Sequence, residues 1–136
     1  MKRKNIAILA LFLLLLFTLA GCGSREEDTK NTASYQQITA EEAKSMMEEQ
    51  PDAVILDVRE QDEYDAGHIP GAVLLPVGTI NEETAASAIP EKDTVVLVYC
   101  RSGNRSKTAS QALADLGYSR IYEFGGIKDW PYEVER

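Results

Sequence analysis

Six consecutive strand-forming residues, Thr94 to Tyr99 (TVVLVY), place the strongest constraint on how this chain folds. A short apolar run rich in branched side chains is typical of a strand that is buried on both faces, as strands in parallel sheets are. Neighbouring strands of such a sheet are joined by crossover helices. The rest of the chain must therefore supply further strands and the helices that cover them.

Strand-like and helix-like segments do alternate from residue 35 onward. The predicted strands span residues 35–38, 54–58, 73–75, 94–99 and 121–124, and the predicted helices span 39–50, 81–88 and 106–116. Thr39 and Glu42 have the spacing of a capping box, and Pro51 ends that helix. The pattern predicts an α/β fold: one domain with a mostly parallel central sheet and helices on both faces.

Length, charge and the number of Cys and His residues limit the number of domains and exclude some classes of function. The 136 residues suffice for one small domain with appendages. The chain carries 14 Lys and Arg against 22 Asp and Glu, a net charge of -8, which argues against a nucleic-acid partner. A single histidine and two cysteines supply neither a Cys/His metal cluster nor a disulfide framework.

The N-terminus has the pattern of an export signal. Lys2, Arg3 and Lys4 precede an apolar run of 15 residues, from 6 to 20. As a helix that run is about 22 Å long, which is shorter than a bilayer core of about 30 Å. It ends in Leu19-Ala20-Gly21-Cys22, which resembles the lipobox of bacterial lipoproteins. A retained short anchor and an ordinary cleaved signal are the alternatives.

The lipobox resemblance implies a division of the chain. Residues 1–21 would be a lipoprotein signal peptide, and Cys22 would carry lipid such as palmitate and become the first residue. Residues 22–33 are polar and predict a flexible stalk, which leaves 34–136 for the domain. Removal of 1–21 leaves a net charge of -11. We expect a protein that is lipid-anchored in the bacterial cell envelope and faces outside the cytoplasm.

Cys100 directly follows the predicted strand 94–99, and ligands of open α/β sheets bind at the carboxyl ends of strands. Gly103 permits a tight bend whose amides form an anion-binding nest, at the start of the next helix. Arg101 and Arg105 add two positive charges. All three features favour a thiolate and predict a lowered pKa for Cys100. A small buried structural cysteine is the alternative.

Three segments together resemble the rhodanese-type sulfurtransferases. They are the loop 100–106 (CRSGNRS), the segment 57–72 (DVREQDEYDAGHIPGA) and the closing segment 125–130 (GGIKDW). In this order they span nearly the whole predicted domain. The resemblance implies that Cys100 is the nucleophile, which carries a sulfane sulfur as a persulfide.

The resemblance also assigns roles to residues around Cys100. The loop that holds the sulfur and the anionic end of the donor is Arg101, Ser102, Gly103, Asn104 and Arg105. The positions expected to brace it are Asp57, Arg59 and Glu63, with Glu63 a candidate partner for Arg105. His68 is expected in a structural turn and Trp130 in packing.

The implied reaction moves a sulfane sulfur from thiosulfate or a related persulfide donor to a thiophilic acceptor, in two steps through a covalent intermediate. The acceptor would be a thiol, cyanide or a thioredoxin-like protein. No metal or organic cofactor is expected, and we expect a monomer.

Two other functions are alternatives for a chain with these motifs. A non-catalytic rhodanese-like binding module would not need Cys100. A Cys-dependent phosphatase or arsenate reductase usually has five residues between cysteine and arginine, whereas four separate Cys100 from Arg105. The smaller loop suits a single sulfur atom better than a phosphoryl group. It also has no Asp to serve as a general acid.

The anchor is tested by Cys22→Ser. Because the acyl chains would be attached to the Cys22 sulfur, this variant should leave the membrane fraction or accumulate unprocessed. Membrane partitioning and size on a gel measure both effects. A variant with unchanged partitioning and unchanged size would rule out lipidation at Cys22.

Overall fold

The computed structural model describes residues 33–136. The predicted signal peptide, Cys22 and almost all of the predicted stalk lie outside the described residues. Within the described range, no helix is both long enough and apolar enough to cross a bilayer.

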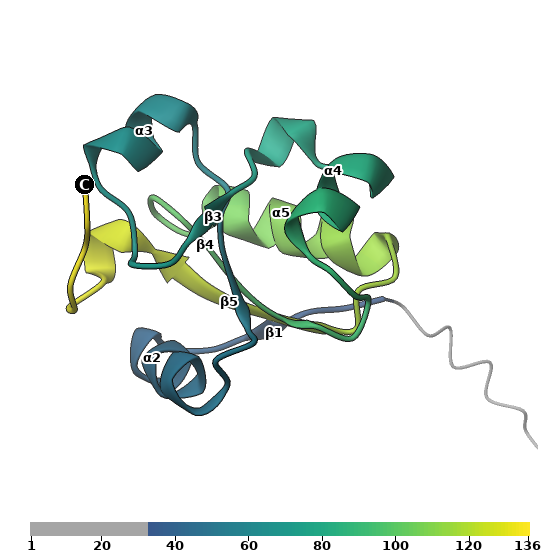
Figure 1. The fold of residues 1–136 in the computed structure, drawn as a ribbon, viewed down its shortest axis with the longest axis horizontal. Helices are drawn as coiled ribbons and strands as arrows, with labels where there is room; N and C mark the ends of the chain where they lie inside the picture. Colours follow the sequence, from purple (N-terminus) through teal and green to yellow (C-terminus); the bar gives the residue numbers. More distant parts are fainter. Residues whose placement is uncertain (1–32) are drawn as a thin grey trace, which may run out of the picture. The chain divides into compact units, whose positions relative to one another are not determined.

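The described residues form a five-stranded parallel sheet with helices on both faces, which confirms the predicted fold class (Figure 1). The strand order is β1-β5-β4-β2-β3. The strands are β1 (Gln36–Gln37), β2 (Val54–Asp57), β3 (Val73–Leu74), β4 (Val95–Cys100) and β5 (Arg120–Gly126). The helices are α2 (Ala40–Glu49), α3 (Gln61–Ala66), α4 (Glu82–Ala88) and α5 (Asn104–Asp115), with 3-10 turns η1 (Val77–Thr79) and η2 (Ile127–Asp129).

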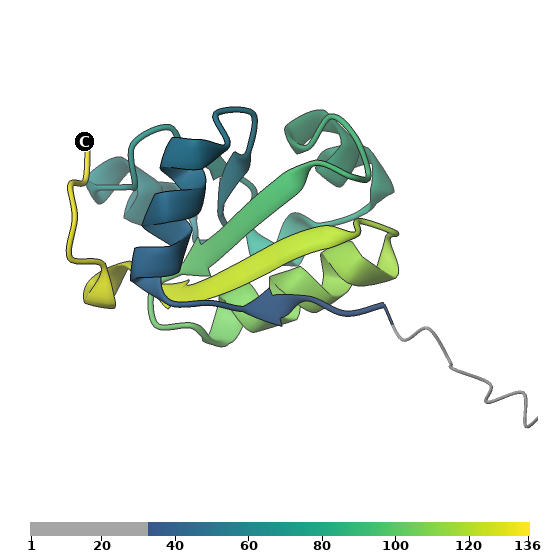
Figure 2. The same ribbon diagram turned by 90° about the horizontal axis from the view of Figure 1, so that it is seen from below.

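The central strand β4 divides the core in two. All six of its residues are buried, and successive side chains point to opposite faces of the sheet. Val96, Val98 and Cys100 pack with α4 and α5, whereas Leu97 and Tyr99 pack with α2 on the other face. Figure 2, seen from below, shows α2 crossing the near face of the sheet.

Several predicted boundaries move in the structure. The capping box of Thr39 and Glu42 is confirmed at the start of α2. Cys100 is the last residue of β4 rather than the residue after it. Helix α5 starts at Asn104, two residues before the predicted start, because Gly103 adopts a left-handed conformation with φ of 100° that turns the chain into the helix. Strand β5 runs to Gly126, whereas the predicted strand ended at Phe124, before the glycine pair.

Helix α3 was not predicted. Its sequence, QDEYDA, has no buried residue and therefore no apolar period to find. Its main inward contact is Tyr64, whose hydroxyl donates to the Ala72 carbonyl over 2.7 Å. Tyr64 also stacks on the His68 ring, with the ring centroids 3.7 Å apart.

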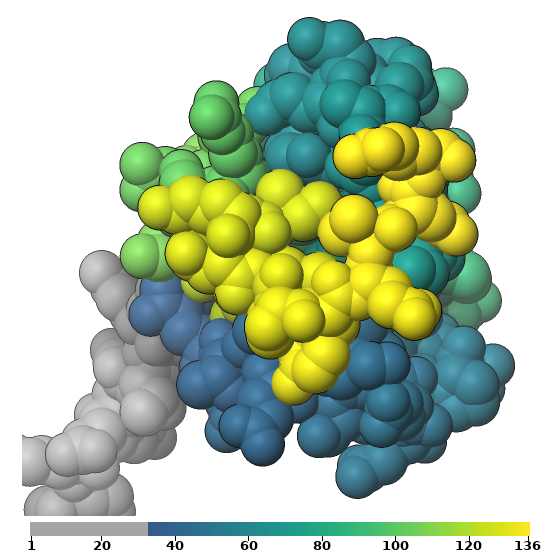
Figure 3. All heavy atoms as spheres, turned by 90° about the vertical axis from the view of Figure 1, so that its left-hand side faces the viewer, coloured from purple at the N-terminus to yellow at the C-terminus, as the bar shows by residue number. Residues whose placement is uncertain are grey.

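The C-terminal segment lies across one end of the molecule. Its residues, yellow in Figure 3, run between α2 and the segment around α3. His68 and Glu135 exchange two backbone hydrogen bonds of 2.9 Å. Trp130 packs on Phe124 with ring centroids 5.5 Å apart. Trp130 thus has the packing environment expected of it, whereas His68 lies in a β-bridge to Glu135 rather than in the expected turn.

The end of β5 makes a close backbone contact with the loop after β4. A Cβ atom on Gly126 would overlap the Arg101 carbonyl and lie 2.6 Å from Ser102 Cα. Only glycine permits this approach. The contact holds the backbone that follows Cys100.

Gly126→Ala should therefore destabilise the domain by roughly 1–3 kcal/mol, the usual cost of overpacking, and displace the loop. Urea unfolding measures the loss. The matched control is Gly78→Ala, because a Cβ there meets nothing within 4 Å. The control should change stability by less than about 0.5 kcal/mol. Equal stability of the two variants would contradict the close contact.

Candidate active site

Cys100 lies at the carboxyl end of the central strand, where β4 pairs with β5. Its register partner is Gly126, and β5 bulges just before this pair. The Cys100 residue is 1% exposed. Parallel strands place their carboxyl ends at one edge of the sheet, so the thiol lies where α/β proteins bind their ligands.

The loop after Cys100 folds back over the sulfur. The Gly103 amide donates to Cys100 Sγ over 3.0 Å. Helix α5 begins with the next residue, so its N-terminal amides and its dipole also face the sulfur. Cys100 Sγ lies 3.4 Å from the hydroxyl of Ser106, a residue of the first turn of α5. The sulfur is therefore surrounded by hydrogen-bonding groups.

These contacts set the pKa of Cys100. Burial alone raises this pKa, because it penalises the thiolate. The hydrogen bond between Cys100 and the Ser106 hydroxyl, together with those from the amides of Ser106, Gly103 and Ser102, outweighs burial, and the net pKa is lowered. A lowered pKa is the predicted direction, and the amides are one of the three predicted causes. The hydrogen bond with the Ser106 hydroxyl was not predicted, and neither arginine is among the causes.

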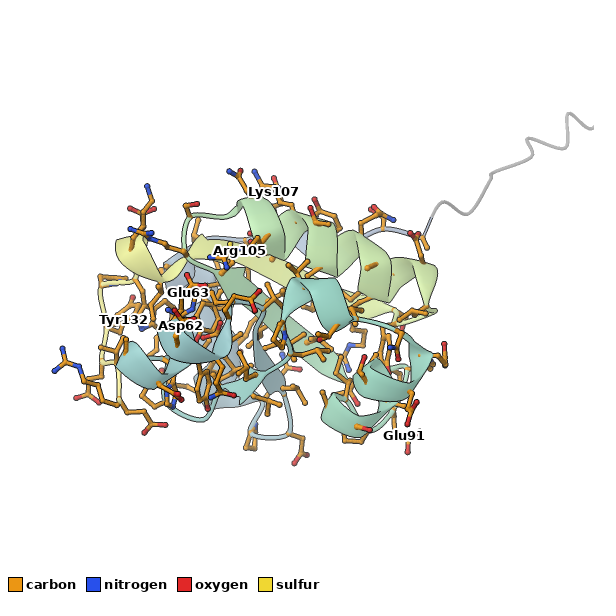
Figure 4. All side chains as sticks on the ribbon, turned by 90° about the horizontal axis from the view of Figure 1, so that it is seen from above. Asp62, Glu63, Glu91, Arg105, Lys107 and Tyr132 are labelled. Carbon is orange, nitrogen blue, oxygen red and sulfur yellow. The ribbon has the colours of Figure 1, made fainter. Side chains whose placement is uncertain are left out.

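The role of the arginines differs from the prediction. Arg105 forms a two-pronged ion pair with Glu63, with N–O distances of 2.7 and 2.8 Å. Figure 4 shows the two side chains meeting between α3 and α5. The Arg105 hydrogen bond holds the pKa of Glu63 at about 2. Because Glu63 largely offsets its charge, Arg105 is a weaker source of thiolate stabilisation than the sequence suggested.

Asp57 and Arg59 form a buried network one strand away. Arg59 Nη2 lies 2.6 Å from Asp57 Oδ2 and donates to the Gly67 carbonyl over 2.8 Å. The Tyr99 hydroxyl donates to the same Asp57 oxygen over 2.5 Å. Burial and this hydrogen bond raise the pKa of Tyr99. The network therefore joins the end of β2 to Gly67, just after α3, and to Tyr99, the residue that precedes Cys100 in β4.

Of the other loop residues predicted to bind substrate, three lie at the surface and one is buried. Arg101, Ser102 and Asn104 are exposed, while Gly103 is buried beneath them. An exposed cation beside a buried thiolate is suited to attracting an anionic donor.

Two further residues belong to the site and were missed as functional residues. They are Ser106, the last residue of the loop motif 100–106, and Glu123 in β5. Ser106 Oγ donates to Glu123 Oε1 over 2.5 Å, and both residues are buried. The available signal was a charged residue inside an otherwise apolar strand, since Glu123 stands between Tyr122 and Phe124.

This arrangement suits nucleophilic attack by a stabilised thiolate on an electrophilic atom, with adjacent amides to hold a transferred anionic sulfur. Within residues 33–136, no group of three or more His, Cys, Asp or Glu side chains has metal-site geometry.

Comparisons with known proteins agree with this site. The Rhodanese-like domain family model matches residues 39–132. The chain is 36% identical over 74 residues to thiosulfate sulfurtransferase PspE of Escherichia coli, covering 54% of this chain and 70% of PspE. It is 32% identical over 111 residues to YrkF of Bacillus subtilis, named as a candidate sulfur carrier protein, covering 81% of this chain but only 58% of YrkF.

A solved structure has the same fold. The E. coli rhodanese solved with anions superposes with a TM-score of 0.58 at 32% identity, covering 62% of this chain and 98% of that one. The family match covers both the Cys100 loop and the Asp57–Arg59 segment. This chain therefore belongs to the family of proteins with a Rhodanese-like domain.

Proposed function

We propose that this protein is a thiosulfate sulfurtransferase that carries a sulfane sulfur as a persulfide on Cys100. One observation carries the proposal: the Cys100 sulfur lies 3.0 Å from the Gly103 amide, inside a loop that lowers the thiol pKa. A thiolate in a nest of amides is both a nucleophile and a holder of anionic sulfur.

The first step loads the enzyme. The Cys100 thiolate attacks the outer sulfur of thiosulfate and forms an S–S bond. The original S–S bond of thiosulfate breaks, and its electron pair leaves with sulfite. The product is a Cys100 persulfide anion, whose outer sulfur the loop amides stabilise.

The second step unloads it. A thiolate, cyanide or a thioredoxin-like protein attacks the outer sulfur of the persulfide. The S–S bond to Cys100 breaks, and the electron pair returns to the Cys100 thiolate. Cys100 is the only cysteine in the described residues, so in this scheme the acceptor comes from another molecule.

The relatives support this choice of substrate. PspE is named as a thiosulfate sulfurtransferase and YrkF as a candidate sulfur carrier. The related E. coli rhodanese was solved with anions. These names support our choice of a small anionic sulfur donor and a thiol acceptor for this protein.

The proposal includes a location outside the cytoplasm. Its support is the lipobox-like Leu19-Ala20-Gly21-Cys22. A domain as acidic as this one is repelled by anionic lipid headgroups, so the lipid on Cys22 would do the tethering.

Sulfur loading is tested on the full chain carrying Cys22→Ser, in which Cys100 is the only thiol. Thiosulfate should add the mass of one sulfur atom, and cyanide should remove it as thiocyanate. Intact mass spectrometry measures the adduct. Cys100→Ser in the same background should show neither adduct nor thiocyanate. An adduct that persists without Cys100, or a folded Cys100 protein that never forms one, would refute the proposal.

The exposed loop cation gives a second prediction. Arg101→Gln should slow loading by thiosulfate about threefold to tenfold at low salt, because it weakens the attraction of the anion. The alkylation pKa of Cys100 should stay below the free value of about 8.5, since Arg101 is not a cause of the shift.

The matched control is Lys107→Gln, which removes an exposed cation from the outer side of α5 (Figure 4). It should leave loading nearly unchanged. If both variants slow loading equally, net charge rather than Arg101 attracts the donor.

A further inference from the structure

Behind the Cys100 thiol, two buried polar side chains form a line that the reaction above does not use. Ser106 Oγ lies 3.4 Å from Cys100 Sγ and 2.5 Å from Glu123 Oε1. The exposed fractions of Cys100, Ser106 and Glu123 are 1%, 0% and 3%. A carboxylate is thus connected to the reactive sulfur through a single hydroxyl, away from water.

The sheet register puts the carboxylate there. Glu123 pairs with Val98 and faces the same side of the sheet as Cys100. The β5 bulge follows, and the Gly125 amide donates to Glu123 Oε1 over 2.8 Å. Ser106, in the first turn of α5, contacts the Glu123 carboxylate. Three elements, β4, β5 and α5, therefore position Cys100, Glu123 and Ser106 relative to one another.

Glu123 has no cationic partner. In the part of the chain that the structure describes, no Lys, Arg or His lies within salt-bridge distance of it. Strand β1, which pairs with β5 on the side away from β4, consists only of glutamines. Around the site, Asp57 pairs with Arg59 and Glu63 with Arg105, while Arg101 and Lys107 are exposed. A buried anion without a cation is costly, and a thiolate next to it adds to the cost.

Counting protons shows how the two acids are linked. A serine hydroxyl has one proton, and the 2.5 Å contact directs it to Glu123 rather than to the Gly125 carbonyl at 3.4 Å. Ser106 then accepts from the thiol. Ser106 donates to a Cys100 thiolate only if Glu123 carries a proton and donates to Ser106 in turn.

We propose that Cys100 and Glu123 share one proton through Ser106, so that the thiolate forms by internal transfer rather than by release of a proton to water. The Cys100 S–H bond breaks and its electron pair stays on sulfur. The proton moves to Ser106 Oγ while the Ser106 proton moves to Glu123 Oε1. The line holds two protons and one negative charge before and after. Glu123 acts through Ser106 and is a positioning residue for the proposed sulfur transfer.

The test counts the protons released when Cys100 is alkylated. It uses the full chain with Cys22→Ser, weakly buffered near neutral pH, with the thiolate fraction read from its ultraviolet absorbance. Without sharing, alkylation releases protons only from the fraction that is still thiol. With sharing, alkylation frees Glu123 to ionise, and about one proton leaves per Cys100 even where the sulfur is already thiolate.

Glu123→Gln is the matched variant, because it keeps the shape and hydrogen bonding but cannot take a proton. Its thiolate should persist, and its proton release should fall to the thiol fraction alone. Ser106→Ala interrupts the line and also removes a hydroxyl that lowers the Cys100 pKa, so its thiolate fraction should fall. Its proton release should likewise equal its own thiol fraction. Wild-type release that simply equals the thiol fraction would overturn the proposal.

Infrared difference spectroscopy tests the wild type without relying on a variant that folds. A carbonyl stretch of a protonated carboxyl group should be present with the Cys100 thiolate and disappear on alkylation. Its absence would refute the shared proton.

The inference rests on the proposed role of Cys100, but its test uses no sulfur donor. A shared proton in a protein that takes no sulfur from thiosulfate would refute the proposed function alone. Sulfur loading without the proton and infrared signatures would refute the shared proton alone.

Discussion

The close approach of the end of β5 to the loop after β4 determines the geometry of the site. Gly126 leaves room for the backbone of Arg101 and Ser102, and in the neighbouring bulge the Gly125 amide donates to Glu123. A side chain at Gly126 would push the loop away from the sheet. The amide distance to the Cys100 sulfur, and with it the thiolate, depends on this one contact between backbones.

The site stabilises its thiolate mainly with neutral hydrogen-bond donors. The amides of Ser102, Gly103 and Ser106 lower the pKa of Cys100, whereas the charge of Arg105 is directed to Glu63. Fixed dipoles in a dry site need no reorganisation when charge moves between sulfur atoms. The remaining loop cation, Arg101, is left at the surface, where it attracts an anionic donor without holding the sulfur.

The elements that the sequence predicted are those with strong local signals. The apolar run of β4, the capping box of α2 and the strand at Val54 depend on neighbouring residues alone. Helix α3 was missed because it is short and polar and is stabilised by contacts with distant residues, among them the Glu63–Arg105 pair. The end of β5 was misplaced because a glycine pair usually ends a strand, and here the bulge keeps it in the ladder.

The sequence by itself determined the parallel α/β fold, the position of Cys100 at the end of the central strand and the anion-binding character of its loop, because each depends on periodicity and on spacing along a few residues. Only the tertiary structure decided which charges meet. Glu63 and Arg105 are 42 residues apart and Ser106 and Glu123 are 17 apart, and both pairs follow from strand register and helix packing. No local pattern specifies that a buried carboxylate lies one hydroxyl away from the reactive sulfur, because that contact exists only once β4, β5 and α5 are assembled.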